Sequence, residues 1–188
     1  MQATAKTLRL VTEEPPGELE TLFRDHHDRV FRTAHRITGS PADAEDVLQT
    51  VFLRIVRNRE TYDLSENVAA YLSRAAINAS LDLMRSRGRA KSVELSEVDP
   101  RALESKFQSP EAEHADRELK TLIRQAVARL GETAGEMFVL RYYEGYDNRE
   151  IARMLGTSQT VVGVVLHRAR TKLRKEIGHY LEKHHEKQ

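Results

Sequence analysis

The positions of proline limit this chain more than any other feature of its sequence. All five prolines lie at positions 15, 16, 41, 100 and 110. Residues 42–99 and 111–188 therefore contain none and can be helical throughout, whereas 100–110 should interrupt them. Apolar residues recur at helical spacing nearly everywhere, with no alternating strand pattern of useful length. The sequence predicts an all-α fold of two small helical modules joined by a flexible acidic linker.

The distribution of charge supports this division. Residues 92–118 carry eight acidic and three basic side chains, a net charge of −5, although the whole chain has a net charge of only +1. The four bases of 85–91 come just before that segment. We expect a disordered lead-in over 1–17, a first module over 18–91, a linker over 92–111, a second module over 112–178 and a basic tail over 179–188.

Several classes of protein are disfavoured by composition. With no cysteine, the chain has no disulfide, thiol nucleophile or Cys-based zinc site. Its longest apolar run, residues 161–166, is far shorter than the ~20 residues of a membrane span, and the N-terminus shows no signal peptide. No phosphate-binding glycine loop or catalytic triad spacing is present, and the histidine pairs at 26–27 and 184–185 lack further clustered ligands. We expect a cytoplasmic protein that is not an enzyme and holds no metal or cofactor.

The helix predicted to start after Ser40 and Pro41 has an unusual outer face. Its buried stripe includes Ala44, Val47 and Ile55. The residues opposite that stripe are acidic, amide and apolar: Ala42, Asp46, Gln49 and Leu53, with Glu45 and Val56 at the edges. Apolar residues set among acids predict a docking patch for a protein with a basic and apolar surface. A solvated face with one exposed leucine fits the periodicity equally well.

The next predicted helix ends in a basic cluster. Asn78, Asp82 and Arg85 lie one turn apart on one side, and Arg87, Arg89 and Lys91 continue beyond them. Arginines at a helix C-terminus also interact favourably with the macrodipole, but four bases in seven residues favour contact with phosphates. In the loop before this helix, Asn58 and Tyr62 accompany two arginines and could hold an unpaired base.

Residues 148–167 have the pattern of a helix-turn-helix. Ala152 is the small residue where the two helices would cross, Gly156 lies in the turn, and Val162 is the buried aliphatic of the second helix. Asp147 and Ser158 can cap the two helices. The second helix should bury Val162, Val165, Leu166, Ala169 and Leu173, and should expose Thr160, Gly163, Val164, His167, Thr171 and Arg174. An ordinary αα-hairpin is the alternative, but the adjacent basic stretch favours DNA binding.

Together these residues resemble the extracytoplasmic-function (ECF) sigma factors, members of the sigma-70 family of bacterial RNA polymerase. The resemblance covers about residues 18–91 and 112–178, in the family's order. Asp43-Ala44-Glu45-Asp46-Val47-Leu48-Gln49 is similar to the motif that docks on the polymerase clamp helices. Residues 71–85 resemble the segment that melts the −10 promoter element, and residues 130–174 resemble the module that reads the −35 element.

The resemblance implies a role for each group of candidate residues. Polymerase binding is expected of Asp43, Glu45, Asp46, Gln49 and Leu53. Contact with the −10 element is expected of Asn58, Tyr62, Asn78, Asp82, Arg85, Arg87 and Arg89. Contact with the −35 element is expected of Arg141, Ser158, Gln159, Thr160, Gly163, Val164, His167, Arg168 and Arg170. At 163–165 the family commonly has polar and basic residues, whereas this chain has Gly163, Val164 and Val165.

The function predicted from the sequence is therefore a transcription initiation factor that binds core RNA polymerase, directs it to promoters and promotes melting. The resemblance also implies an anti-sigma factor as a partner. A dimeric helix-turn-helix regulator that acts without polymerase is the alternative, and it would not need the docking patch of the first module. An enzyme with an appended DNA-binding module is disfavoured, because 18–91 contains no convergent acid/base set.

Overall fold

The computed structural model describes residues 17–57, 68–94 and 111–185, and all regular structure in these ranges is helical. The helices are α1 (Glu18–Thr38), α2 (Pro41–Arg57), α3 (Val68–Glu94), α4 (Glu111–Ala128), α5 (Glu132–Tyr142), α6 (Asn148–Met154) and α7 (Gln159–His185). The predicted all-α fold is confirmed. Four parts of the predictions lie outside the described residues: positions 1–16 of the expected lead-in, Asn58 and Tyr62, positions 95–110 of the expected linker, and the last three residues.

The helix ends follow the local signals in the sequence. Gly39 ends α1 in a left-handed conformation, with φ of 73°, and its N–H donates to the His35 carbonyl at 2.8 Å. The Ser40 hydroxyl accepts from the Asp43 N–H at 3.3 Å, and Pro41 is the first residue of α2. These two neighbouring signals set the tight turn that folds α2 back along α1.

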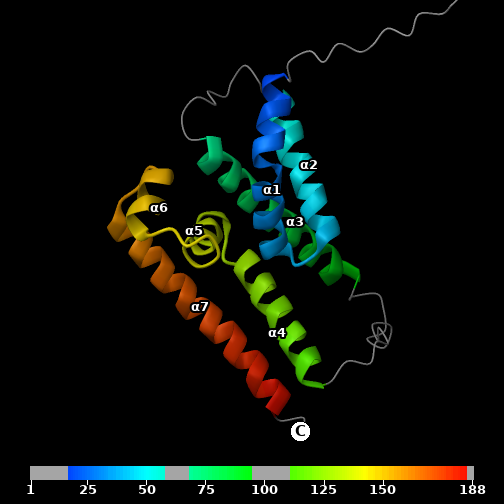
Figure 1. Ribbon diagram of the computed structural model, residues 1–188. Coiled ribbons are helices and arrows are strands. Elements are labelled where there is room, and N and C mark those ends of the chain that lie inside the picture. The colour runs from blue at the N-terminus through cyan, green and yellow to red at the C-terminus, as the bar shows by residue number, and fades with distance from the viewer. Residues whose placement is uncertain (1–16, 58–67, 95–110, 186–188) are drawn as a thin grey trace, which may run out of the picture.

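The first module is a bundle of α1, α2 and α3 around its own core (Figure 1). Its buried residues lie at three- and four-residue intervals on the facing stripes of the three helices. They are Val30, Ala34, Ala44, Val47, Val51, Phe52, Ile55, Leu72, Ala76 and Ala79. This core leaves the opposite face of α2 uncovered by the rest of the described chain.

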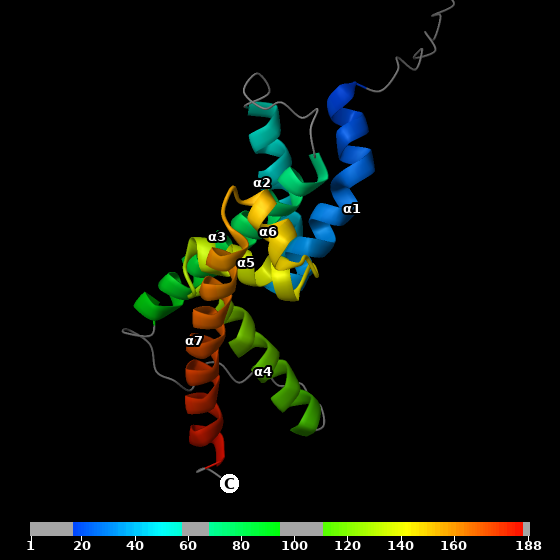
Figure 2. The ribbon, with the colours of Figure 1, turned by 90° about the vertical axis from the view of Figure 1, so that its left-hand side faces the viewer.

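The second module consists of α4 to α7, and its core extends into the first module. The short helices α5 and α6 pack against the first half of α7, while α4 and α7 extend together away from the first module (Figure 2). The core around Val127, Leu140 and Ile151 also contains Ile37 of α1 and Ile77 and Leu81 of α3. The two modules that the sequence predicts are therefore joined by a shared apolar seam as well as by the chain.

Candidate polymerase and nucleic-acid interfaces

The outer face of α2 is as exposed as its periodicity predicts. Asp46 and Gln49 face solvent, and the side chains of Leu53 and Val56 are 51% and 47% exposed. Exposed aliphatic groups on a helix whose other face is fully packed leave apolar area available to another molecule. Glu45 is exposed at the edge of this face.

Asp43 lies apart from that face. It is 7% exposed, and its carboxylate accepts a hydrogen bond from Arg87 near the end of α3. A buried carboxylate needs such a partner, so Asp43 holds the start of α2 against α3. The same contact engages Arg87, one of the residues expected to contact DNA.

Three of the other four α3 candidates, Asn78, Asp82 and Arg85, are also held by contacts within the chain. The Asn78 side-chain amide donates to the Glu136 carboxylate of α5 at 3.4 Å. Arg85 bonds to Asp82 at 2.6 Å and donates to the Ala128 carbonyl at 2.9 Å. Arg89 is exposed. Two of these contacts reach across the seam, so the structure covers part of the surface that the sequence assigns to the −10 element.

The helix-turn-helix is formed by α6, a tight turn and the first half of α7. Asp147 and Glu150 form a capping box at the start of α6, and the backbone N–H of Glu150 lowers the pKa of the Asp147 carboxyl. Gly156 takes the left-handed turn conformation with φ of 61°. The Ser158 hydroxyl accepts from the Val161 N–H at 3.2 Å. Both predicted caps are present.

The outward face of α7 is mixed apolar and basic. The exposed candidates on it are Ser158, Gln159, Thr160, Val164, His167, Arg168 and Arg170, joined by Val161, which the sequence analysis did not single out. Val162 and Leu166 are buried, and Val165 packs against the core. Gly163 is half-buried beside Asn148 of α6. Arg141 is exposed and donates to the Tyr146 carbonyl at 3.1 Å.

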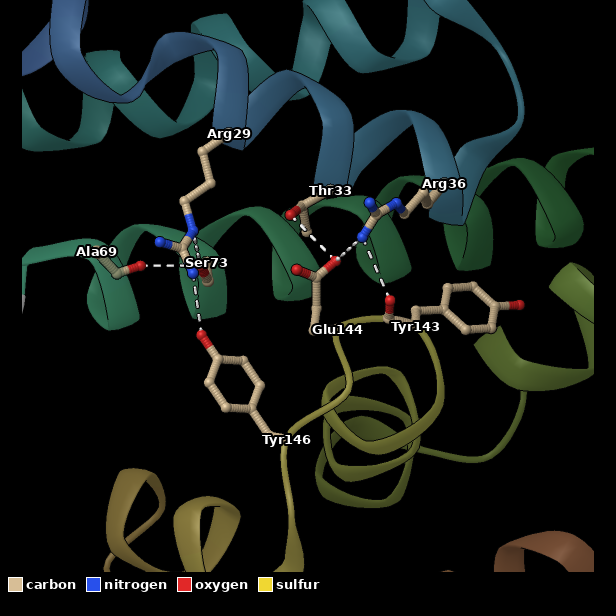
Figure 3. Close-up of polar contacts among 8 residues, drawn as sticks. All are labelled: Arg29, Thr33, Arg36, Ala69, Ser73, Tyr143, Glu144 and Tyr146. Atoms are coloured by element: carbon tan, nitrogen blue, oxygen red, sulfur yellow. Dashed lines mark hydrogen bonds and ion pairs between the residues drawn. The ribbon is translucent and has the colours of Figure 1, made fainter.

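The seam between the modules is polar at its edges, and sequence reasoning did not anticipate it. Glu136 is buried on α5, and its carboxylate accepts from Arg74 of α3 at 2.7 Å. Glu144 accepts from Thr33 and Arg36 of α1 at 3.2 and 3.4 Å (Figure 3). Glu136 could have been recognised by its position between Gly135 and Met137, in a helix with several buried residues. A carboxylate at a buried position requires a partner, which would have indicated a polar contact with another helix.

Comparison with known proteins places both modules in one family. The model of Sigma-70 region 2 matches residues 22–90, and that of Sigma-70 region 4 matches residues 120–173. The RNA polymerase sigma-E factor of Streptomyces coelicolor is 34% identical over 161 residues, which cover 85% of this chain and 86% of that protein. The chain belongs to the sigma-70 family.

Within this family the chain is an ECF sigma factor. The ECF RNA polymerase sigma factor SigE of Mycolicibacterium smegmatis is 33% identical over 165 residues, or 88% of this chain and 62% of that protein. A solved structure of CnrH in complex with the cytosolic domain of CnrY has the same fold. It is 22% identical with a TM-score of 0.51, and the alignment covers 84% of this chain and 85% of that one. The chain is a transcription initiation factor that directs RNA polymerase to promoters.

In the part of the chain that the structure describes, no group of three or more His, Asp or Glu side chains is placed to hold a metal ion. Among the described helices, none combines the length and the hydropathy of a membrane span.

Proposed function

We propose that this sigma factor divides its work between three surfaces. The outer face of α2 binds core RNA polymerase, α3 and the loop before it take the −10 element, and the outward face of α7 reads the −35 element. The protein acts in the cytoplasm and catalyses no covalent step itself. The observation that carries the proposal is the helix-turn-helix, whose α7 exposes basic residues in a region 4 module, while the region 2 module separately exposes an acidic and apolar helix face.

The polymerase surface consists of Glu45, Asp46, Gln49 and Leu53. All four are exposed, and none of the contacts within the described chain requires them to be acidic, amide or apolar. An acidic rim around a leucine is suited to a partner with apolar and basic side chains. Because Asp43 is buried and paired with Arg87, its role is to fix the start of α2 behind that surface.

The −10 surface combines Asn78, Asp82, Arg85, Arg87 and Arg89 with Asn58 and Tyr62 of the preceding loop. Arginines hold phosphates, whereas an amide and an aromatic ring suit an unpaired base. A protein that binds an unpaired strand in this way favours melting, because it stabilises the melted DNA and not the closed duplex.

The −35 surface is the outward face of α7. In this proposal Arg141, Arg168 and Arg170 bond to phosphates, and the exposed residues Ser158, Gln159, Thr160, Val164 and His167 contact the groove. Gly163 has no side chain, so it can contact DNA only through its backbone atoms. With a valine in the centre of this face, apolar contact with thymine methyl groups replaces part of the usual hydrogen-bond readout.

Simultaneous binding to both elements requires the modules to separate. Elements named −10 and −35 are about 25 base pairs apart, or roughly 85 Å at ~3.4 Å per base pair. A compact chain of this length has a radius of gyration of only about 16 Å. In the structure α3 and α5 are in contact through Arg74 and Glu136 at 2.7 Å. The structure is therefore a closed form, and the promoter-bound protein must be open.

Gel-shift measurement on one promoter fragment tests the proposal against the dimeric regulator. The protein alone and the protein with core RNA polymerase are compared on the same DNA. A sigma factor yields a specific shift only with polymerase, and permanganate then detects unpaired thymines near −10. Specific binding of a palindrome by the protein alone, with no added effect of polymerase, would instead establish the regulator.

A further inference from the structure

The polar contacts of the seam share one direction. Arginines of the first module donate, and oxygen atoms of the second module accept. Arg29 donates to the Tyr146 hydroxyl at 3.0 Å, and Arg36 donates to Glu144 and to the Tyr143 carbonyl. Arg74 donates to Glu136 and to the Met154 carbonyl at 3.0 Å, and Arg85 donates to the Ala128 carbonyl. The second module thus presents a set of oxygen acceptors to a set of guanidinium groups.

These arginines form one continuous face. Arg29 and Arg36 are seven residues apart and lie on one side of α1, whereas Arg74 and Arg85 are eleven residues apart on one side of α3. The Arg29 guanidinium also donates to the Ser73 hydroxyl of α3 at 3.1 Å, which joins the two stripes (Figure 3). Asn78, four residues after Arg74, lies on the same stripe. The face therefore runs directly into the surface proposed for the −10 element.

Two of the acceptors that cover this face are carboxylates, and the others are backbone carbonyls and the Tyr146 hydroxyl. The Glu136 and Glu144 side chains are only 9% exposed, and each carboxylate accepts from the first module: Glu136 from Arg74 and Asn78, Glu144 from Arg36 and Thr33. When the modules part, the arginines lose these acceptors together. Phosphate oxygens are the groups that match guanidinium donors most closely, in charge and in geometry.

We propose that Arg29, Arg36 and Arg74 are further nucleic-acid contacts, which bind backbone phosphates of the promoter strand in the open protein. In the closed protein Glu136 and Glu144 take the place of those phosphates, so the second module and the DNA compete for the same side chains. The inference rests on the proposed −10 role of α3. We infer nucleic acid as the ligand of this face, and not an acidic protein, because the arginine face is continuous with Asn78 and with the basic end of α3.

Binding of single-stranded DNA by the full chain tests this competition. The probe is a fluorescent oligothymidylate of about a dozen nucleotides, since phosphate contacts do not depend on base sequence. The double variant Glu136→Gln/Glu144→Gln should bind it more tightly than the parent, on the order of tenfold if about one tenth of the parent molecules are open. Glu132→Gln, an exposed position on the same helix, is the matched control and should change nothing.

The salt dependence of binding identifies the groups responsible. Adding Arg29→Gln, Arg36→Gln and Arg74→Gln to the double variant should reduce the log–log slope by about 2, since each phosphate contact on a single strand contributes ~0.7. The control is Arg24→Gln on α1, where Arg24 is exposed and pairs locally with Asp25. An unchanged slope in the arginine variant would refute the arginine face.

Opening is measured separately from DNA binding. Because the chain contains no cysteine, Arg54→Cys and Lys175→Cys provide unique positions for a donor and an acceptor dye, one on each module. Energy transfer should fall in the double glutamate variant. If that variant stays closed or binds no tighter, the proposed competition is wrong.

The same arginine substitutions in holoenzyme give a second, independent result. With polymerase on a promoter they should lower the salt dependence of open-complex formation while selection of that promoter is kept. Failure of the proposed function would give a different result. If the holoenzyme does not select the promoter, and if replacing Asn78 does not impair open-complex formation, then the proposed −10 role of α3 is wrong. Unchanged salt dependence in holoenzyme would refute the arginine face alone.

Discussion

Val164 limits what α7 can read in DNA if this helix is the proposed recognition helix. Its side chain is 45% exposed on the outward face of α7, and Val161 is 46% exposed three residues before it. Neither side chain can donate or accept a hydrogen bond, so in a major groove they distinguish bases mainly by contact with the thymine methyl group.

Val164→Ala should therefore reduce discrimination between thymine and uracil at the contacted −35 position, because the two bases differ only in that methyl group. Binding of holoenzyme to paired promoter fragments measures the ratio. Arg168→Ala should weaken binding about equally on all −35 sequences, since a phosphate contact carries no sequence information. Strong guanine dependence in a −35 base scan, abolished by Arg168→Ala, would show that Arg168 reads a base.

Gly163 lies in the interior of α7, where glycine costs about 1 kcal/mol relative to alanine. A Cβ built on it meets only the Asn148 side chain, at 3.9 Å, which is ordinary contact. Gly163→Ala should therefore raise the free energy of unfolding by roughly 0.4–1 kcal/mol, measured by urea denaturation. If the variant gains stability but loses −35 binding, close approach of the α7 backbone to DNA is the reason for the glycine. Unchanged binding would remove that explanation.

At the scale of single elements, the sequence was most informative where a local signal decides the structure. Gly39, Ser40 and Pro41 set the turn between α1 and α2, and Asp147 and Ser158 cap α6 and α7. Those ends depend on a few neighbouring atoms, so they could be predicted. Asp43 could not be placed by periodicity, because its pairing with Arg87 depends on a helix 44 residues away in sequence.

The proposed role of the outer face of α2 can be tested by measuring the affinity of variants for core polymerase. Asp46→Arg or Gln49→Ala should weaken binding to core polymerase, because the first reverses a charge and the second removes an amide at the proposed interface. Both should leave the helical content unchanged, because both side chains are exposed. Competition binding against the parent protein measures the affinity, and circular dichroism measures the helicity. Normal binding by both variants would rule out this face as the interface. Arg24→Gln, on an exposed part of α1, is the control.

Helix α5 approaches α3 closely at Gly135. A Cβ on this buried glycine would lie 3.1 Å from a Leu81 methyl group and 3.4 Å from the Val127 carbonyl oxygen. Gly135→Leu should therefore push α5 away from α3 and lower energy transfer between the dyes on the two modules, with α1 to α3 still folded. Gly131→Leu is no suitable control, because Gly131 has a φ of 97°. Thr133→Leu, at an exposed position of the same helix, should leave the transfer unchanged.

At the scale of the whole molecule, the sequence predicted the helices of the two modules but not the contacts between the modules. The sequence analysis did not single out Ile77 and Leu81 of α3, and both belong to the core of the second module. The positions of Asn78 and Arg85 on one side of α3 were predicted, whereas their bonds to Glu136 and Ala128 were not. Contacts between modules depend on three-dimensional arrangement, on which a single sequence has little direct information.

The closed form should persist when the linker is cut. The seam combines apolar contacts of Ile37, Ile77 and Leu81 with the arginine contacts of α1 and α3. A specific protease site inserted within 95–110 allows the chain to be divided there without disturbing either described module. The two fragments should still elute together in size-exclusion chromatography, because the shared core and the partly buried Arg74–Glu136 ion pair remain.

Salt and substitution then distinguish the components of that association. High salt should weaken it only in part, since screening acts on the exposed arginine contacts and much less on buried apolar area. Glu136→Gln should weaken it further by removing the charge that Arg74 faces, whereas Glu132→Gln should not. Core polymerase bound to promoter DNA should break the contacts between the fragments if promoter-bound protein is open, because the two modules must then lie at elements roughly 85 Å apart. Fragments that separate at low salt without polymerase would show that the seam does not hold the protein closed in solution.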